Sequence, residues 1–314
     1  MKRRTLFRGA AIGAAAIPAA AFGYSALAEP TATAANYEVS ITEQRTNRLL
    51  NFKRGSAWTD ANITWSWSPG GGGWSNLSDV KYRNTASFGW IALATASGGK
   101  VGIVNMTSEK HQELNDLLWS ATPGGNPHAI ERIPDIGAIV TASSAGFLTV
   151  YGPTAVSKPS TLAKVQTVTL AGAHGVLWDP TRKLLWAIGD KVLRAYQVTG
   201  SYRNTRLKAT SKKVTLKGLG HDLQPDYSDK GKLLITDTYG AYEVNASTLA
   251  KKTVREGRLI KSYVRDSAGE GMWLQAKNNE PRPWSSDTVR WDSGSKVRSG
   301  GHIYKARIVT TSFN

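Results

Sequence analysis

The sequence predicts an all-β fold, and within that class a β-propeller of six four-stranded blades. Short runs rich in Val, Ile, Leu and Trp are separated by turn residues, and no long stretch has helical spacing of its apolar residues. A repeat supports the same fold. Five short segments align on their first residues and start 50, 46, 47 and 41 residues apart, at Ser78, His128, His174, His221 and Ser262. A period in the forties with about four strands per unit is typical of propeller blades.

Each repeat continues with a hairpin, as in 184–189 followed by 193–198. Upstream, 39–42 and 49–52 form a sixth hairpin of the same kind. The 286 residues after position 28 hold about six units of roughly 46 residues. Stacked blades close into a ring when the two chain ends pair, and 303–311 is one candidate for the closing strand.

The N-terminus predicts an export signal over 1–28. Arg3 and Arg4 precede a short Ala/Gly-rich apolar stretch, and an Ala-x-Ala motif ends at Ala28. The adjacent arginines are typical of the twin-arginine type of signal. We expect cleavage after Ala28, a short linker over 29–36, one propeller domain over 37–314 and a secreted protein. The apolar stretch is too short to span a membrane, which takes about 20 residues, so we expect no transmembrane segment.

The composition is basic and lacks cysteine. The 314 residues include 40 Lys and Arg against 23 Asp and Glu, a net charge of +17, and loss of the four basic residues of 1–28 leaves +13. A net positive charge of this size creates an electrostatic field that attracts anions, so the expected partners are an acidic polysaccharide or a cell-wall polyanion. Alternatively, the charge only keeps the protein soluble. The absence of cysteine excludes disulfides and thiolate metal sites. No nucleic-acid-binding motif is present, and we expect a monomer that binds no specific nucleic acid.

Three of the five histidines, His128, His174 and His221, occupy the same repeat position. The first strand of a propeller blade is the innermost, so these side chains should meet at one mouth of the central channel. Imidazole titrates near neutral pH and is the commonest metal ligand. The three histidines are therefore candidate catalytic residues, and candidate ligands of a divalent metal at the channel mouth. Alternatively, each histidine only bonds the backbone of a neighbouring blade. Ser78 and Ser262 would continue the ring with hydroxyl groups.

Further polar and aromatic residues are candidate substrate-binding groups. Lys81, Gln224 and Arg265 stand three residues after the aligned position, and a cation beside histidines suits a carboxylated sugar. Trp74 ends a glycine loop, where an indole is a candidate platform for a sugar ring. For Trp65 and Trp67, which share one strand face, we expect packing between blades. The alternative for the charged positions is a solvated rim.

Besides the export signal, five short segments carry a resemblance to a known family: Ile41-Thr42-Glu43-Gln44, Arg48-Leu49-Leu50, His221-Asp222-Leu223-Gln224-Pro225, Trp284-Ser285-Ser286-Asp287-Thr288-Val289-Arg290 and Tyr304-Lys305-Ala306-Arg307. Together they resemble a family of exported bacterial propeller proteins known only as a domain of unknown function. The resemblance covers the chain after the signal, implies the six-bladed fold and implies no reaction.

These observations predict an exported, carbohydrate-active propeller that acts on or binds an acidic, uronate-type glycan. If it is an enzyme, a polysaccharide lyase is the expected class, with His174 or His221 as the base and Arg265, Lys81 or a metal neutralising the carboxylate. The alternative is a non-catalytic scaffold that binds an anionic wall polymer or a protein. Metal-dependent hydrolysis of a small ester or lactone is a third hypothesis, but the aligned ring contains too few carboxylates for it. Fold analogy alone does not choose among them.

Overall fold

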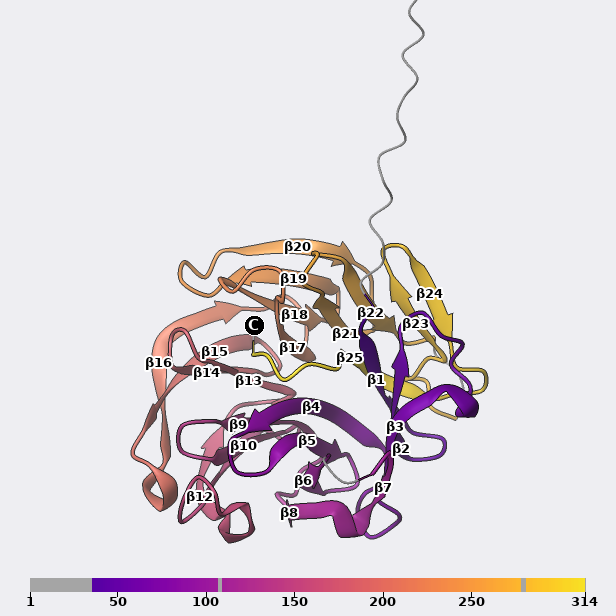
Figure 1. The fold of residues 1–314 in the computed structure, drawn as a ribbon. Helices are drawn as coiled ribbons and strands as arrows, with labels where there is room; N and C mark the ends of the chain where they lie inside the picture. The colour runs from indigo at the N-terminus through magenta and orange to yellow at the C-terminus, as the bar shows by residue number, and fades with distance from the viewer. Residues whose placement is uncertain (1–35, 107–108, 278–280, 314) are drawn as a thin grey trace, which may run out of the picture. The chain divides into compact units, whose positions relative to one another are not determined.

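Six sheets form a ring around a central axis, which confirms the predicted six-bladed propeller (Figure 1). The computed structural model describes residues 36–106, 109–277 and 281–313, which belong to one compact unit starting at Ala35. The predicted export signal, its cleavage site and most of the linker lie outside the described residues. Within the described ranges, no helix is long and apolar enough to cross a membrane.

Each blade runs outward from the axis. Blade 1 contains β25 (Ile303–Ile308), β1 (Glu38–Glu43), β2 (Arg48–Lys53), β3 (Ile63–Ser68) and β7 (His111–Glu113). Blade 2 contains β4 (Leu77–Thr85), β5 (Gly89–Ala96), β6 (Val101–Asn105) and β8 (Leu117–Ala121). Blade 3 contains β9 (Pro127–Ile133), β10 (Ala138–Ser143), β11 (Phe147–Gly152) and β12 (Ala163–Thr169).

The second half of the chain repeats this plan. Blade 4 contains β13 (Gly175–Asp179), β14 (Leu184–Ile188), β15 (Val192–Thr199) and β16 (Arg206–Thr215). Blade 5 contains β17 (Asp222–Pro225), β18 (Lys232–Asp237), β19 (Gly240–Asn245) and β20 (Lys251–Glu256). Blade 6 contains β21 (Ile260–Arg265), β22 (Gly271–Gln275), β23 (Thr288–Trp291) and β24 (Gly294–Val297). Short 3₁₀ turns occur at η1 (Asp60–Asn62), η2 (Leu114–Asp116), η3 (Pro159–Thr161) and η4 (Tyr202–Asn204).

The last strand closes the ring. β25 pairs antiparallel with β1, with Val39 opposite Ile308, so the two ends of the propeller share blade 1. β25 also contacts the innermost strands of the flanking blades, β21 and β4. The closing strand is thus the first part of the candidate segment 303–311.

The hydrophobic core is divided among the blade interfaces, because each sheet buries both faces against its neighbours. One apolar cluster lies between each pair of adjacent blades. Between blades 1 and 2, Trp67 packs edge-on against Trp74 with ring centroids 5.0 Å apart, and Trp65 packs against Tyr82. The predicted packing role of Trp65 and Trp67 is confirmed.

The two ends of the axis differ. The innermost strands begin at the end that carries the three histidines. The opposite end is where β25 finishes, and the chain then passes across the centre of the ring (Figure 1). There the guanidinium of Arg83 lies 4.0 Å from the ring centre of Phe313 and donates to the carbonyl of Ser312. The C-terminal residues therefore cover the end of the axis opposite the histidines.

Candidate functional site

The three aligned histidines meet at one end of the axis. The ring centres of His128 and His174 are 4.4 Å apart, and those of His174 and His221 are 4.8 Å apart. Tyr304, from the closing strand, lies 5.7 Å from His128 and 5.9 Å from His221. Residues of blades 3, 4, 5 and 1 thus form one cluster, as the repeat alignment predicted for the histidines.

β-Bulges at two positions turn the side chains of His128 and Lys261 toward this cluster. Where β9 pairs with β10, the register shifts at His128, and where β21 pairs with β22, it shifts at Lys261. A bulge inserts an extra residue and turns a side chain away from its regular direction. Lys261 therefore reaches the site, although the repeat alignment selected its neighbour Ser262.

The cluster lines a cavity of about 330 Å³, which we call the histidine pocket. The sequence predicted the three histidines among its lining residues and did not point to Lys261, Trp284 or Tyr304 as part of the site. Trp284 is 39% exposed and donates its indole N–H to Gln44. Within the described residues, no carboxylate lines this pocket. Its lining is Gln44, Asn76, Ser97, Asn126, His128, His174, His221, Lys261, Trp284 and Tyr304.

Hydrogen bonds fix the proton positions of two imidazoles. Nδ1 of His128 lies 2.9 Å from the carbonyl oxygen of Asn126, and Nδ1 of His174 lies 2.7 Å from that of Gly172. A carbonyl only accepts, so each Nδ1 carries the proton, and Nε2 of the neutral ring keeps a lone pair. Burial lowers the pKa of His174 to about 4 and the pKa of His128 well below its usual range. Both rings are therefore neutral near pH 7.

Lys261 is the cationic group that lines the pocket. Burial, with Lys305 nearby, lowers the pKa of its ammonium to about 8, so it is largely charged at neutral pH. Burial and the charge of Lys261 also lower the pKa of His221. Burial raises the pKa of Tyr304, whose hydroxyl lies 3.2 Å from Nε2 of His221 and stays protonated. The pocket therefore combines one cation with neutral donors and acceptors.

The histidines do not fit a metal centre. No group of three or more His, Asp or Glu in the described ranges has a geometry that could hold a metal ion. Nε2 of His221 lies 3.2 Å from the hydroxyl of Tyr304, so this ring nitrogen already has a partner. Lys261 and Lys305 would also repel a cation. The three histidines are therefore not the ligands of a metal centre in this structure.

Two predicted substrate-binding residues, Lys81 and Gln224, lie inside the ring instead of lining the pocket. The ammonium of Lys81 is buried, donates to the carbonyl of Val176 and lies 3.8 Å from Glu131. The amide of Gln224 donates to the carbonyl of its neighbour Leu223. Both residues have structural partners, because the position three residues after the aligned one points into the interior. This corrects the prediction that they contact substrate beside the histidines.

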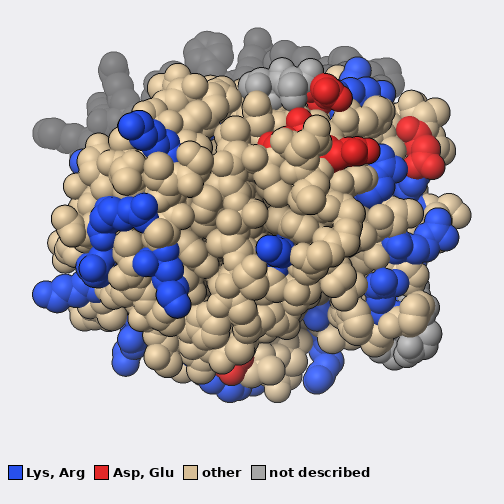
Figure 2. All heavy atoms as spheres, turned by 90° about the horizontal axis from the view of Figure 1, so that it is seen from below, with Lys and Arg blue, Asp and Glu red and all other residues tan. Residues whose placement is uncertain are grey.

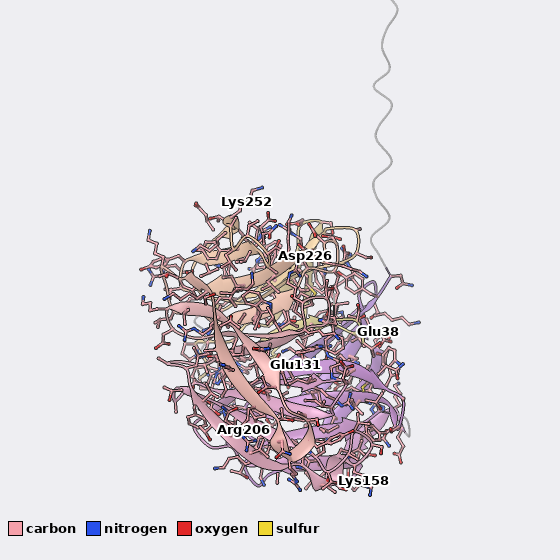
Figure 3. All side chains as sticks on the ribbon, turned by 90° about the vertical axis from the view of Figure 1, so that its left-hand side faces the viewer. Glu38, Glu131, Lys158, Arg206, Asp226 and Lys252 are labelled. Carbon is pink, nitrogen blue, oxygen red and sulfur yellow. The ribbon has the colours of Figure 1, made fainter. Side chains whose placement is uncertain are left out.

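The interior of the ring holds an ion-pair network that the sequence did not reveal. Arg307 bridges Asp79 and Asp222, each at 2.7 Å, and Lys305 lies 3.2 Å from Asp222. Arg83 lies 2.6 Å from Glu131, which is fully buried and is labelled in Figure 3. Burial alone would raise the pKa of Asp222, but Arg307 and Lys305 lower it to about 2.

Arg265 and Trp74 also lie outside the pocket. Arg265 pairs with Asp226 at 2.9 Å and Glu243 at 2.8 Å, at the far end of β21 from Lys261. Trp74 is only 2% exposed and packs against Trp67, so it offers no face to a ligand. Ser78 and Ser262 are buried and bonded to neighbouring strands, so the expected hydroxyl wall is absent from the described lining. Trp284, not Trp74, is the tryptophan in the described lining of the pocket.

The fold and the site define a six-bladed β-propeller with a histidine-lined pocket at one end of its axis. The chain belongs to the family of unknown function DUF6528, whose model matches residues 40–313. No curated protein matches the sequence.

Similar solved structures share the fold at low sequence identity. A functionally unknown protein from Desulfotomaculum acetoxidans DSM 771 is 12% identical, with a TM-score of 0.58 over 88% of this chain and 100% of that one. A protein of unknown function from Bacteroides caccae is 13% identical, with a TM-score of 0.58 over 88% of this chain and 99% of that one. A chain of the nidogen/laminin complex is 12% identical, with a TM-score of 0.55 over 88% and 100%. At such identities the likeness concerns the fold alone.

Proposed function

We propose that the histidine pocket binds the acidic, uronate-type sugar of an extracellular glycan. One observation carries the proposal: Lys261 lines the pocket without a lining carboxylate to neutralise it. An anionic ligand group would supply that partner through a charge-assisted hydrogen bond. The lone pairs on Nε2 of His128 and His174 would accept sugar hydroxyls, and the amides of Gln44, Asn76 and Asn126 both donate and accept.

Size and shape support a sugar. A cavity of about 330 Å³ is at the small end of ligand sites, which span about 300–1,000 Å³. The exposed indole of Trp284 offers a flat apolar face of the kind that binding sites favour. The extracellular location is part of the proposal and rests on the twin-arginine-type signal predicted over 1–28. Replacing Arg3 and Arg4 by lysine should abolish export, and the uncut chain in the cytoplasm of the native host would contradict the location.

Titration calorimetry tests the binding. Glucuronate and galacturonate should bind, whereas glucose and galactose should bind much more weakly. Lys261→Gln should lower the affinity for the acidic sugars by roughly tenfold or more, since a hydrogen bond to a charged group contributes about 1.5–3 kcal/mol. Lys252→Gln, at an exposed position of β20, is the matched control. Equal binding of acidic and neutral sugars would overturn the proposal.

A second candidate function is β-elimination within the same pocket, favoured by the contact between Tyr304 and His221. A neutral imidazole would take the proton from the carbon next to the carboxylate, and Lys261 would neutralise that carboxylate. The C4–O bond would then break as the C4–C5 double bond forms, and the leaving oxygen would take a proton from Tyr304. The unsaturated product absorbs ultraviolet light. A panel of uronate polymers should show this absorbance, and His174→Ala and His221→Ala should abolish it. Binding without absorbance would leave a non-catalytic pocket.

The alternative scaffold function is favoured by a different observation, the distribution of charge. Residues 151–220 contain 12 Lys and Arg against two acids, Asp179 and Asp190. Four of these cations, Lys164, Arg206, Lys208 and Lys213, are exposed on β12 and β16, the outer strands of blades 3 and 4. Figure 2 shows a group of basic side chains without acidic ones on the left, the side that carries β12 and β16 in Figure 1. Such a surface would attach the protein to an anionic wall polymer.

A further inference from the structure

A second cavity adjoins the histidine pocket. It has a volume of about 340 Å³ and shares His174, His221 and Lys261 with the first cavity. We call it the outer compartment. Because three residues line both spaces, one ligand could occupy both at once. The remaining lining is Asp190, Leu219, Gly220, Asp237, Thr238, Leu259 and Ile260.

One wall of the outer compartment is apolar and exposed. Leu219 is 53% exposed and Leu259 is 43% exposed. Leu259 has a φ of +63°, a conformation that is uncommon for residues other than Gly, Asn and Asp. Hydrogen bonds hold both segments: the N–H of Leu219 donates to Thr238, and the carbonyl of Leu259 accepts from Ala276. The structure thus maintains two leucines in an exposed position beside the pocket.

The outer compartment shares Lys261 with the histidine pocket but adds two carboxylates, Asp190 and Asp237, which the lining of the histidine pocket lacks. Asp237 already accepts hydrogen bonds from the backbone of Gly218 and Tyr239. Asp190 makes no side-chain hydrogen bond with any described residue, so its carboxylate can accept ligand hydroxyls. It lies against Gly172, where an added Cβ would come within 1.7 Å of its oxygen. Two carboxylates would repel a second anionic sugar and accept the hydroxyls of a neutral one.

We infer that the ligand is a mixed glycan, in which a neutral sugar in the outer compartment is linked to the acidic sugar in the histidine pocket. The inference rests on the proposed function and adds the composition of the glycan. The apolar face of the neutral sugar would lie on Leu219 and Leu259, and Asp190 would accept hydrogen bonds from the hydroxyls of this sugar. A homopolymer of uronates would place a carboxylate beside Asp190 and bind more weakly.

Calorimetry with three probes tests the inference: a free uronate, a uronate linked to a neutral hexose, and a uronate linked to a second uronate. The mixed disaccharide should bind at least about fivefold more tightly than either other probe, because it buries part of two leucines. Leu259→Ser should remove this advantage and leave the affinity for the free uronate unchanged. Val297→Ser, at a 51% exposed position on β24, is the control that should change neither. Asp190→Asn should raise the affinity for the diuronate relative to the mixed probe.

The outcomes separate the two proposals. If the free uronate binds but the mixed disaccharide gains nothing, the inference is overturned and the proposed function stands. If the diuronate is the probe that binds most tightly to the unaltered protein, the inference is likewise overturned and the proposed function stands. If none of the three probes binds, the proposed function fails and the inference fails with it.

Discussion

The hydroxyl of Tyr304 lies 3.2 Å from Nε2 of His221, and this contact joins the closing strand β25 to blade 5. The Tyr304 ring also packs edge-on against His128. Residues 128 and 221 come from the middle of the chain, whereas Tyr304 enters only when β25 pairs with β1. The site is therefore complete only after the two ends of the propeller have met.

Tyr304→Phe should weaken ligand binding with little effect on folding. The substitution removes a hydroxyl from the pocket lining and keeps the aromatic packing. One hydrogen bond from this hydroxyl to the ligand would typically contribute about 0.5–1.5 kcal/mol. The expected loss of affinity for an acidic sugar is about two- to tenfold by calorimetry. Tyr82→Phe is the matched control, because the Tyr82 hydroxyl bonds Ser40 and Asn51 between blades 1 and 2. It should lower thermal stability and leave affinity unchanged; equal affinity losses in both variants would contradict a role of Tyr304 in the site.

The part of the site that the sequence predicts is the part that follows the repeat. His128, His174 and His221 align because each stands at the start of an innermost strand. The alignment does not select Lys261, because a bulge shifts the register of β21 by one residue. The alignment does not detect Tyr304, because β25 is separated in sequence from the rest of blade 1. It does not detect Trp284, because this residue lies in the connection between β22 and β23. Bulges and ring closure depend on pairing between strands, which a periodic pattern does not encode.

Acidification should destabilise the protein in two steps. Burial lowers the pKa of His174 to about 4, whereas an unfolded histidine has a pKa of about 6.5. Between these values the unfolded chain binds more protons, so the free energy of unfolding falls as the pH drops from about 6.5 to 4. Asp222, with a pKa of about 2, adds a second loss between about pH 4 and 2.

Thermal unfolding measured at a series of pH values checks this prediction. In His174→Gln, the decrease between pH 6.5 and 4 should be shallower and the decrease below pH 4 should be unchanged. An identical profile of the variant and the original protein through the upper window would show that His174 does not titrate as its burial implies.

Arg307→Met should destabilise the fold strongly. Arg307 is buried and bridges Asp79 and Asp222, so its loss leaves two interior carboxylates with one remaining cation, Lys305, on Asp222. Removing one partner of a buried ion pair typically costs about 3–5 kcal/mol. Urea unfolding at pH 7 measures the loss.

Two further variants interpret the Arg307 result. Adding Asp79→Asn to Arg307→Met should recover part of the stability, because it removes a carboxylate left without its cation. Lys277→Gln breaks a partly exposed pair with Asp287 and should cost no more than about 1 kcal/mol. Equal losses from Lys277→Gln and Arg307→Met would mean that the interior network contributes no more than a surface pair.

The charged residues show why a sequence does not separate a free cation from a buried one. Lys81 and Arg265 occupy the same repeat position, and both were predicted to contact a carboxylated ligand. In the fold, each meets acids of the protein itself: Lys81 lies near Glu131, and Arg265 pairs with Asp226 and Glu243. These partners belong to neighbouring strands and blades, so the charge left for a ligand depends on packing between repeats.

Salt should separate general attraction to polyanions from selective binding in the pocket. The basic surface on β16 is exposed, and screening shortens the range of its field to about 8 Å at physiological ionic strength and 3 Å at 1 M. Retention on columns of anionic polymers should therefore fall steeply with salt. Replacing Lys212, Lys213 and Lys217 by glutamine should weaken retention on every anionic polymer alike. Lys261→Gln should selectively weaken retention on a uronate-containing glycan, because Lys261 lines the pocket and is only partly exposed to solvent. If Lys261→Gln lowers retention on all polymers equally, the pocket adds no selectivity and the basic surface accounts for the binding.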